Sequence, residues 1–376
     1  MKEDWILIRY GEISLKSDWV RKKFEHRLMD NIRAGFEEEG VDGKVKKGYG
    51  RIFVKTGEIE DASQVLSRVF GIVSFSPCMK LETKLEKIIE RTGEVGEELI
   101  DSDETFAVRA RRTGDHEFTS QDLEREIGSK IVNLTEAEVD LDNPDETVFV
   151  EVRQGQTYIF TEKLEGPGGM PIGTQGRVLS LFKGDCNSFL ATWLLMKRGC
   201  SVTLLHGNLD PYMSEEGFKK AMEGLEKWSY GASLQTKKFE LGEVLFKFQE
   251  NVDRTSICIL CKGFLTGLAS EIASEEEIKA IVSGESSGNS FEDFRFEDAK
   301  TELPVFRPLI GFSEDEIREK CKKIGVDFLL KKEKCKARTE GDSEVSEERL
   351  KEMESSLNFN KLLKEKVREV RKNENS

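Results

Sequence analysis

The chain has 376 residues, of which 37% are hydrophobic and 35% are charged, so it is long enough for two or three domains with sizeable cores. Its 58 Lys and Arg against 72 Asp and Glu give a net charge of −14, which excludes a uniformly basic nucleic-acid-binding protein but not a basic face on one domain. No run is expected to span a membrane and the N-terminus does not read as a signal peptide, so we expect a cytoplasmic protein.

The first 78 residues predict a small α+β domain. In the helix predicted over 18–39, Val20, Phe24 and Leu28 recur every four residues and give an apolar stripe, and Gly40 ends it. The order strand, helix, strand, helix, strand is typical of a ferredoxin-like sandwich. The predicted elements are strands 6–10, 51–56 and 72–75 and helices 18–39 and 61–70.

A second α+β module is predicted over 79–165, from helices 85–99 and 120–132, strand 105–111, and a hairpin of strands 148–152 and 157–161 around Gly155. The stretch Glu165–Gly176 follows, with five glycines and two prolines, and it cannot form regular structure. We place a linker at 166–176 and a third domain at 177–376.

The third domain opens with a β-loop-α-β unit: strand 178–182, loop 183–188, helix 189–198 and strand 202–205. A loop between the carboxyl end of a strand and the N-terminus of a helix is a ready anion site, because free N–H groups and the helix dipole point at it. The pattern predicts an α/β domain with a doubly wound parallel sheet. Further elements are expected at 214–228 (helix), 244–248 (strand), 261–273 (helix) and 278–282 (strand), with a capping box of Ser313 and Glu316 before a last helix.

Seven cysteines, an odd number, argue against a disulfide framework. Cys258 and Cys261 form a CxxC pair at a helix start, which can share a metal or cluster, act as a redox pair, or be two small buried side chains. The other isolated cysteines are expected to be structural: Cys78, Cys200, Cys186 as a small loop filler, and Cys321 on the apolar face of a helix.

Several stretches resemble the archaeal form of the tRNA 4-thiouridine synthetase (tRNA sulfurtransferase) family over nearly the whole chain. These are IRYGEISLKS (8–17), FAVRARRTGDHEFTSQDLEREIG (106–128), VFVEVRQGQTYIFTEKLEGPGGMPIGTQGRVLSL (148–181), SGES (283–286) and LPVFRPLIGFSEDEI (303–317). The resemblance implies a ferredoxin-like domain, a THUMP RNA-binding domain and a PP-loop domain of the adenine nucleotide α-hydrolase type. It also implies that ATP activates a tRNA uridine, which is then thiolated to 4-thiouridine.

By the same resemblance, ATP with Mg²⁺ would contact residues on four stretches of the third domain. They are Leu181, Phe182, Lys183, Gly184, Ser188, Leu205, His206, Lys262, Gly284 and Asp293. The loop departs from the family's SGGxDS, since Lys183, Asp185 and Asn187 replace a Ser, a Gly and an Asp. Asp185 places a negative charge where an anion would bind, Asn187 removes a carboxylate that could hold Mg²⁺, and Lys183 could supply a phosphate contact. His206 could equally be a simple hydrogen-bonded residue.

The resemblance further implies that Cys258, Cys261 and Cys335 hold an iron–sulfur cluster that supplies sulfur, from sulfide or a persulfide carrier. Arg109, Arg111 and Arg112 would contact the backbone or the 3′ end of tRNA, or else lie on a solvated edge. The oligomeric state is left open, with a homodimer as one option. Two alternative functions remain: a tRNA-binding protein that no longer uses ATP in the usual mode, and sulfur transfer toward the thiazole of thiamine.

Overall fold

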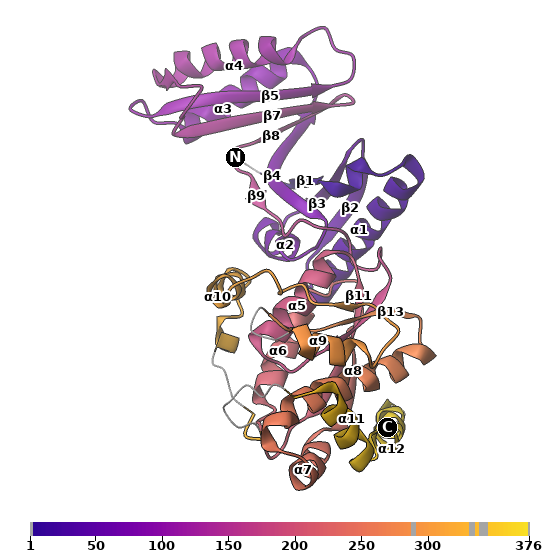
Figure 1. The fold of residues 1–376 in the computed structure, drawn as a ribbon. Helices are drawn as coiled ribbons and strands as arrows, with labels where there is room; N and C mark the ends of the chain where they lie inside the picture. The colour runs from indigo at the N-terminus through magenta and orange to yellow at the C-terminus, as the bar shows by residue number, and fades with distance from the viewer. Residues whose placement is uncertain (1–2, 287–290, 331–334, 338–344, 375–376) are drawn as a thin grey trace. The chain divides into compact units, whose positions relative to one another are not determined.

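The computed structural model describes residues 3–286, 291–330, 335–337 and 345–374, with only the backbone of 291–293 and 374 (Figure 1). It divides into two compact units, Met1–Pro171 and Ile172–Ser376, and each unit has its own hydrophobic core.

Unit 1 is built on one nine-stranded sheet with the order β2-β3-β1-β4-β8-β7-β5-β6, and β9 pairs with β4. The long strand β4 joins the two halves, because its start pairs with β1 and its end pairs with β8. The strands are β1 (Trp5–Tyr10), β2 (Gly43–Gly48), β3 (Arg51–Thr56), β4 (Ile72–Glu82), β5 (Thr105–Thr113), β6 (Glu138–Val139), β7 (Glu146–Arg153), β8 (Gln156–Phe160) and β9 (Leu164–Glu165).

Two pairs of helices pack on this sheet, α1 (Asp18–Glu39) with α2 (Ile59–Leu66), and α3 (Leu85–Leu99) with α4 (Ser120–Thr135). A short 3-10 helix, η1 (Glu12–Leu15), precedes α1. In Figure 1, α3 and α4 cover one face of β5 and β7. The predicted α+β modules are therefore confirmed, although β2 was missed because its run of lysines shows no apolar alternation.

Unit 2 holds a parallel sheet with the order β12-β11-β10-β13-β14. The chain moves outward from β10 through β11 to β12, then returns to the other side of β10 with β13. That reversal is a topological switch point, where ligands bind at the carboxyl ends of the strands in open α/β sheets. The strands are β10 (Arg177–Leu181), β11 (Ser201–Asn208), β12 (Gln235–Glu240), β13 (Ile278–Val282) and β14 (Val305–Phe306).

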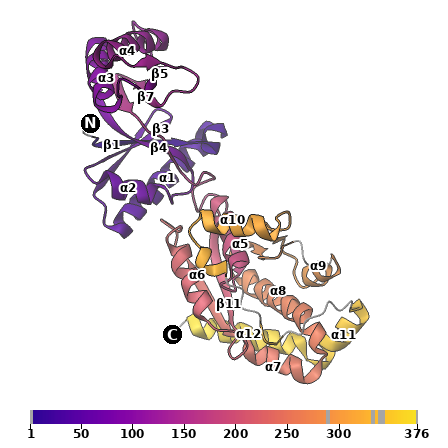
Figure 2. The same cartoon turned by 90° about the vertical axis from the view of Figure 1, so that its left-hand side faces the viewer.

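Helices cover both faces of the parallel sheet (Figure 2), as predicted for a doubly wound domain. One layer holds α5, α6 and α10, and the other holds α7, α8 and α12. The helices are α5 (Cys186–Lys197), α6 (Glu216–Glu226), α7 (Gly242–Asn251), α8 (Ile257–Glu275), α9 (Phe291–Asp298), α10 (Glu314–Lys323), α11 (Glu347–Ser356) and α12 (Phe359–Glu374), with 3-10 turns η2 (Arg254–Ser256) and η3 (Asp327–Leu330).

The sequence-based expectations about α7 and the start of α5 are wrong. Residues 244–248 form part of α7 and not a strand, because Val244, Leu245 and Phe248 are buried at helical spacing while Phe246 is 56% exposed. Helix α5 starts at Cys186, three residues earlier than predicted, because Asp185 caps it.

One helical stretch of unit 2, residues 254–275, is long and apolar enough to cross a membrane. However, 72% of its apolar window is buried inside the fold, as in the core helix of a soluble protein.

Candidate functional site

The loop 183–188 leaves the carboxyl end of β10 at the switch point, and Gly284 follows β13 beside it. A Cβ on Gly284 would lie 2.7 Å from the backbone nitrogen of Ser188, so only glycine allows this approach. Gly184 has a φ of +84°, and a Cβ there would lie 2.4 Å from Cα of Phe218. The two glycines therefore fix the loop against the end of β13 and the start of α6.

Four backbone N–H groups of the loop, those of Lys183, Gly184, Asp185 and Ser188, are hydrogen-bonded within the loop itself. The Asp185 carboxylate accepts a hydrogen bond from the Ser188 N–H at 2.8 Å, which completes a capping box for α5. The Ser188 hydroxyl oxygen accepts the N–H groups of Lys183, Gly184 and Asp185 at 3.2, 3.2 and 3.3 Å. These bonds are long, so they are weak, but they occupy the donors that an anion at the α5 N-terminus would use.

Lys183 is the exposed cation of this loop. Desolvation alone would lower its pKa, but the charges of Asp185, Cys261 and Glu285 outweigh that effect and the pKa is raised. The side chain therefore keeps its proton and faces the start of α8. A positive charge fixed beside the loop is suited to an anionic group.

Two of the predicted cysteines, Cys258 and Cys261, lie in the first turns of α8, and Cys335 packs against the same apolar cluster as Cys261. Burial raises the pKa of Cys261 to about 12, with Lys183 opposing and Cys258 and Cys335 adding to the rise. The three thiols thus interact electrostatically. Among the described residues, however, no group of three or more His, Cys, Asp or Glu side chains is arranged to hold a metal ion, so the iron–sulfur site stays a prediction.

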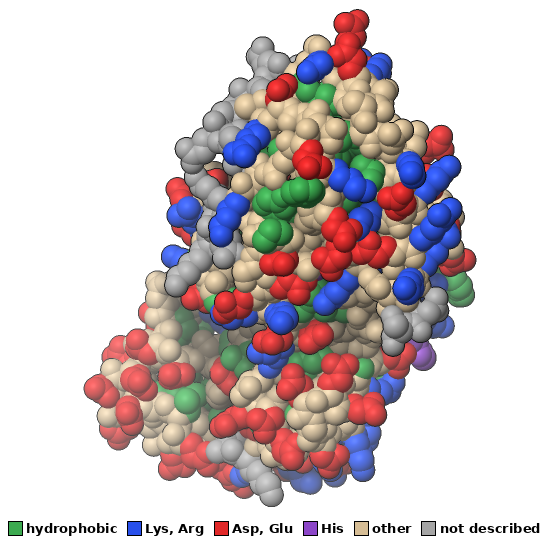
Figure 3. All heavy atoms as spheres, turned by 90° about the horizontal axis from the view of Figure 1, so that it is seen from below, with side chains coloured by type: hydrophobic (Ala, Val, Ile, Leu, Met, Phe, Trp, Pro, Cys, Tyr) green, Lys and Arg blue, Asp and Glu red, His purple; other side chains and the backbone are tan. Residues whose placement is uncertain are grey.

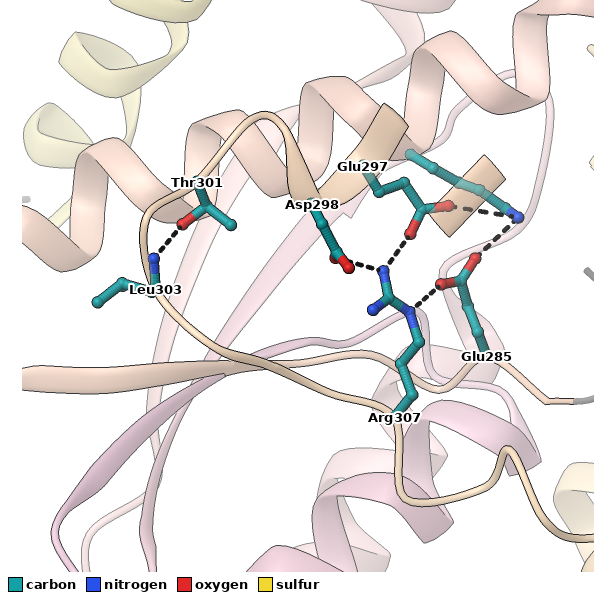
Figure 4. A network of polar contacts seen from close by, with 7 residues as sticks. Glu285, Glu297, Asp298, Thr301, Leu303 and Arg307 are labelled. Atoms are coloured by element: carbon teal, nitrogen blue, oxygen red, sulfur yellow. Dashed lines mark hydrogen bonds and ion pairs between the residues drawn. The ribbon is translucent and has the colours of Figure 1, made fainter. Parts of the chain in front are cut away.

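A largely buried charge cluster that we did not predict includes Glu285, the residue after Gly284. We call it the Arg307 cluster, and it consists of Lys262, Glu285, Glu297, Asp298 and Arg307. The Arg307 guanidinium contacts Glu285 at 3.1 Å, Glu297 at 3.0 Å and Asp298 at 2.9 Å (Figure 4). The ammonium of Lys262 lies 2.7 Å from Glu285 and 3.6 Å from Glu297.

Three carboxylates in the Arg307 cluster face two cations, so full ionisation would leave a net charge of −1 (2 − 3). Burial raises the pKa of Glu297 to about 8, and its contact with Glu285 adds to the rise. The pKa of Glu285 is lowered to about 2, because the contacts with Glu297, Lys262 and Arg307 overcome its own desolvation. Near neutral pH the pair therefore holds one proton, on Glu297, and the cluster is balanced. Lys262, a predicted ATP contact, is held in place by this cluster.

The remaining predicted nucleotide contacts differ in exposure. Phe182 and Leu205 are buried, and the Phe182 N–H bonds the Leu205 carbonyl at 2.9 Å, so their side chains are core. Nδ1 of His206 lies 2.9 Å from the Phe182 carbonyl, its ring stacks on Phe218, and burial lowers its pKa. Leu181 keeps part of its surface, while the side chain of Asp293 lies outside the described residues.

A disulfide joins Cys186, the first residue of α5, to Cys321 on α10. The expectation that Cys186 is a loop filler is therefore wrong, and one disulfide forms although the odd cysteine count argued against a disulfide framework; Cys321 is buried as predicted. The sequence does not predict this bond, because the two cysteines are 135 residues apart in the chain and come together only in the folded domain.

One face of the unit 1 sheet is strongly basic. Residues paired in register point to the same face of a sheet, and alternate residues along a strand share it. The registers of β2, β3, β1, β4, β8, β7 and β5 therefore bring nine basic side chains together with two acids, Glu151 and, at the end of β4, Glu82. We call this the basic sheet face: Arg9, Lys44, Lys46, Arg51, Lys55, Lys80, Arg109, Arg111 and Arg153.

Aromatic rings lie under these cations. Lys80 is 4.4 Å from the Trp5 ring centroid, and Arg9 is 4.8 Å from that of Phe160. The pKa of Lys80 is lowered by burial and then by Lys46 and Lys55, so the positive charges repel one another. By contrast, the view in Figure 3 shows acidic and basic side chains on the same face, with acidic side chains gathered at its lower left.

Of the three predicted RNA-contacting arginines, Arg109 and Arg111 belong to the basic sheet face and are exposed. Arg112 points to the opposite side of β5 and donates to the carbonyls of Gly114 and His116 at 3.2 and 3.3 Å. The structure therefore separates Arg112 from the other two. The wider basic face was missed, because its residues come from five more strands.

Comparison with known proteins gives three family matches along the chain. Residues 5–76 match the ThiI ferredoxin-like domain, residues 82–162 the THUMP domain, and residues 173–359 the thiamine biosynthesis protein (ThiI) family. The chain is 38% identical over 336 residues to a probable tRNA sulfurtransferase of Thermococcus kodakarensis, covering 85% of this chain and 87% of the relative. It is 36% identical over 334 residues to that of Methanothermobacter thermautotrophicus, covering 86% and 85%.

The fold is also similar to that of a 4-thiouridine synthetase solved as an RNA complex with bound ATP. That comparison has a TM-score of 0.85 at 27% identity and covers 97% of each chain. A protein from Pyrococcus horikoshii matches with a TM-score of 0.68 at 32% identity, covering 85% of this chain and 99% of the other.

Proposed function

Because the chain belongs to the ThiI family of tRNA sulfurtransferases, we propose that it uses ATP to replace the O4 oxygen of a tRNA uridine with sulfur, giving 4-thiouridine. The observation that carries this proposal is the meeting of three separate stretches at the switch point. Lys183 of the loop, Cys261 and Lys262 of α8, and Glu285 after β13 interact with one another there.

The tRNA would bind on the basic sheet face. A surplus of positive charge binds phosphates through counterion release, and the buried aromatic rings beneath it support the cations through cation–π contacts. Three arginines, Arg9, Arg51 and Arg153, share the carboxylate of Glu151, which is only 3% exposed. Two of those three charges are therefore left for phosphates. Because the positive charges are concentrated on this one surface, it can bind RNA although the net charge of the chain is −14.

ATP would lie across the carboxyl ends of β10 and β13, with its phosphates toward the α5 N-terminus. Lys183 and Lys262 would neutralise phosphate charge as the uridine O4 attacks the α-phosphate and pyrophosphate leaves. For the phosphates to use the loop N–H groups, they must displace the Ser188 hydroxyl, whose bonds to those groups are long. With Asp185 beside them, we expect weak ATP binding.

Sulfur would reach C4 of the activated uridine beside Cys258, Cys261 and Cys335 in one of two forms. Sulfide held next to these thiols would attack C4 directly, and AMP would leave with the former O4 oxygen. Alternatively, a persulfide that a carrier forms on one of them would attack through its outer sulfur, and a second thiol of the three would then break the S–S bond, which releases 4-thiouridine and leaves a disulfide for a dithiol to reduce. An iron–sulfur cluster on these cysteines remains a prediction, and none of these steps passes through it. Iron and acid-labile sulfide analysis of anaerobically purified protein tests it directly.

Isothermal titration with ATP and Mg²⁺, with and without tRNA, tests the proposed ATP chemistry. We expect saturable binding that Lys183→Ala weakens at least about tenfold, together with pyrophosphate release that needs tRNA. If the protein still binds tRNA but neither binds ATP nor releases pyrophosphate, a second candidate is favoured: a tRNA-binding protein that has lost ATP chemistry. The internal capping of the loop by Asp185 is the observation that favours this second candidate.

A further inference from the structure

We propose that Cys186 and Cys321 form a reversible thiol–disulfide pair that controls the nucleotide loop. This inference deepens the proposed function and rests on it for its effect on ATP. Cys186 lies between Asp185 and Ser188, the two residues whose side chains accept hydrogen bonds from the loop N–H groups. A covalent bond at this position fixes the loop in its self-satisfied conformation.

The partner of Cys186 lies on a separate element. Cys321 is fully buried on α10, and a capping box of Ser313 and Glu316 stabilises the start of this helix. The disulfide connects α10 to the first turn of α5. While the bond is intact, α5 cannot shift at its N-terminus without moving α10. The loop N–H groups then keep their hydrogen bonds to the Ser188 hydroxyl and are not available to a phosphate.

Both redox states fit the site. The Cys321 sulfur lies 3.8 Å from the Cys186 carbonyl oxygen, so after reduction its S–H has an acceptor in place. Cys186 is the first residue of α5, where free N–H groups and the helix dipole favour a thiolate. Cys186 keeps 7% of its surface while Cys321 is fully buried, so a reductant attacks the Cys186 sulfur and the Cys321 thiolate leaves.

The reaction is a thiol–disulfide exchange with a low-molecular-weight disulfide, RSSR. The Cys186 thiolate attacks one sulfur of RSSR and RS⁻ leaves. The Cys321 thiolate then attacks the Cys186 sulfur and the second RS⁻ leaves, each RS⁻ taking one proton from a cysteine thiol. The two cysteines are oxidised, RSSR is reduced to two RSH, and a dithiol runs the reaction in reverse.

Thiol counting tests the bond itself. Of the seven cysteines, five lie outside the disulfide, so alkylation of unreduced, denatured protein should label five thiols, and seven after reduction. Dithiothreitol should reduce the bond in the folded protein, and cystamine should restore it. Seven labelled thiols without reduction, or a bond that is reduced only after unfolding, would overturn the proposal.

Hydrogen exchange of residues 183–188 tests the control of the loop without any nucleotide. We expect exchange in the reduced protein, and in Cys321→Ser and Cys186→Ser, to be at least about tenfold faster than in the oxidised protein. Cys200→Ser, which changes a buried thiol near the other end of α5, should leave the difference between oxidised and reduced states unchanged. Equal exchange in both redox states would refute a role for the bond.

ATP binding separates this inference from the proposed function. Reduction should tighten ATP binding about fivefold or more, because the open loop becomes the populated state. If exchange speeds up on reduction but neither state binds ATP, the redox pair is supported while the proposed ATP chemistry fails. If both states bind ATP with the same affinity, the proposed function stands and control by the disulfide is refuted.

Discussion

Replacing Arg307 with methionine tests the Arg307 cluster most strongly. Arg307 is the group that bridges Glu285 and Glu297, and all three side chains are at least nine-tenths buried. Methionine preserves much of the side-chain length and removes the charge. The variant leaves two buried carboxyl groups with Lys262 as their remaining cation.

Removing one partner of a buried ion pair costs about 3–5 kcal/mol, because the other charge is left desolvated. The contact with Asp298 adds under about 1 kcal/mol, since that carboxylate is 51% exposed. For a unit of roughly 200 residues, each kcal/mol shifts Tm by about 2–4 °C, so Arg307→Met should lower the Tm of unit 2 by about 6–20 °C.

The loss should also depend on pH. Arg307 lowers the folded-state pKa of both Glu285 and Glu297, so its removal raises both values, and the stability that the variant lacks increases as pH rises and the carboxyl groups ionise. Calorimetry between pH 5 and 8 should therefore show a larger difference from wild type at pH 8. Arg318→Met, which breaks an exposed pair with Glu314 at 3.8 Å, is the matched control and should change stability by under about 1 kcal/mol. Equal effects of the two variants, or a loss independent of pH, would refute the account of the cluster.

Three further variants test the Arg307 cluster, the basic sheet face and the packing of Gly284. The folded-state pKa of Glu297, about 8, lies above its unfolded value, so the free energy of unfolding falls as pH rises toward 8. Glu297→Gln should remove this fall, as measured by denaturant titrations at several pH values. A pH dependence equal to that of the wild type would contradict the prediction. Arg111→Ala should weaken tRNA binding and reduce the slope of log K against log salt by about 1, whereas Arg112→Ala should do neither; equal effects would contradict the basic sheet face. Gly284→Ala should lower Tm and weaken ATP binding at least about tenfold, because its Cβ would meet Ser188 at 2.7 Å, while Gly311→Ala, with open space around it, should not.

The fold was largely predictable from the sequence, and the family prediction is confirmed by the relatives of 36% and 38% identity. Regular apolar spacing located α1, and the β-loop-α-β pattern predicted the parallel sheet. Residues 244–248 were misassigned because a short apolar run does not by itself distinguish a strand from a helix. Strand β12 and helices α11 and α12 were missed, since high charge concealed their burial patterns.

The site was predicted only in part. A strand-to-helix loop and a CxxC pair can both be recognised from residues that are neighbours in the sequence. The Arg307 cluster does not, because Lys262, Glu285 and Arg307 come from three elements and their pairing depends on the order of the sheet. The same holds for the Cys186–Cys321 disulfide. The basic sheet face is encoded in strand register, which alternation within one strand cannot reveal.

The most direct test of the proposed function is 4-thiouridine formation in vitro. Unmodified tRNA is incubated with the reduced protein, ATP, Mg²⁺ and sulfide, and the digested nucleosides are measured by mass spectrometry. We predict ATP-dependent 4-thiouridine that is lost in Cys335→Ala and strongly reduced in Lys183→Ala. Under the same conditions, tRNA that binds the protein and stays unthiolated would contradict the proposal that this chain is an active sulfurtransferase.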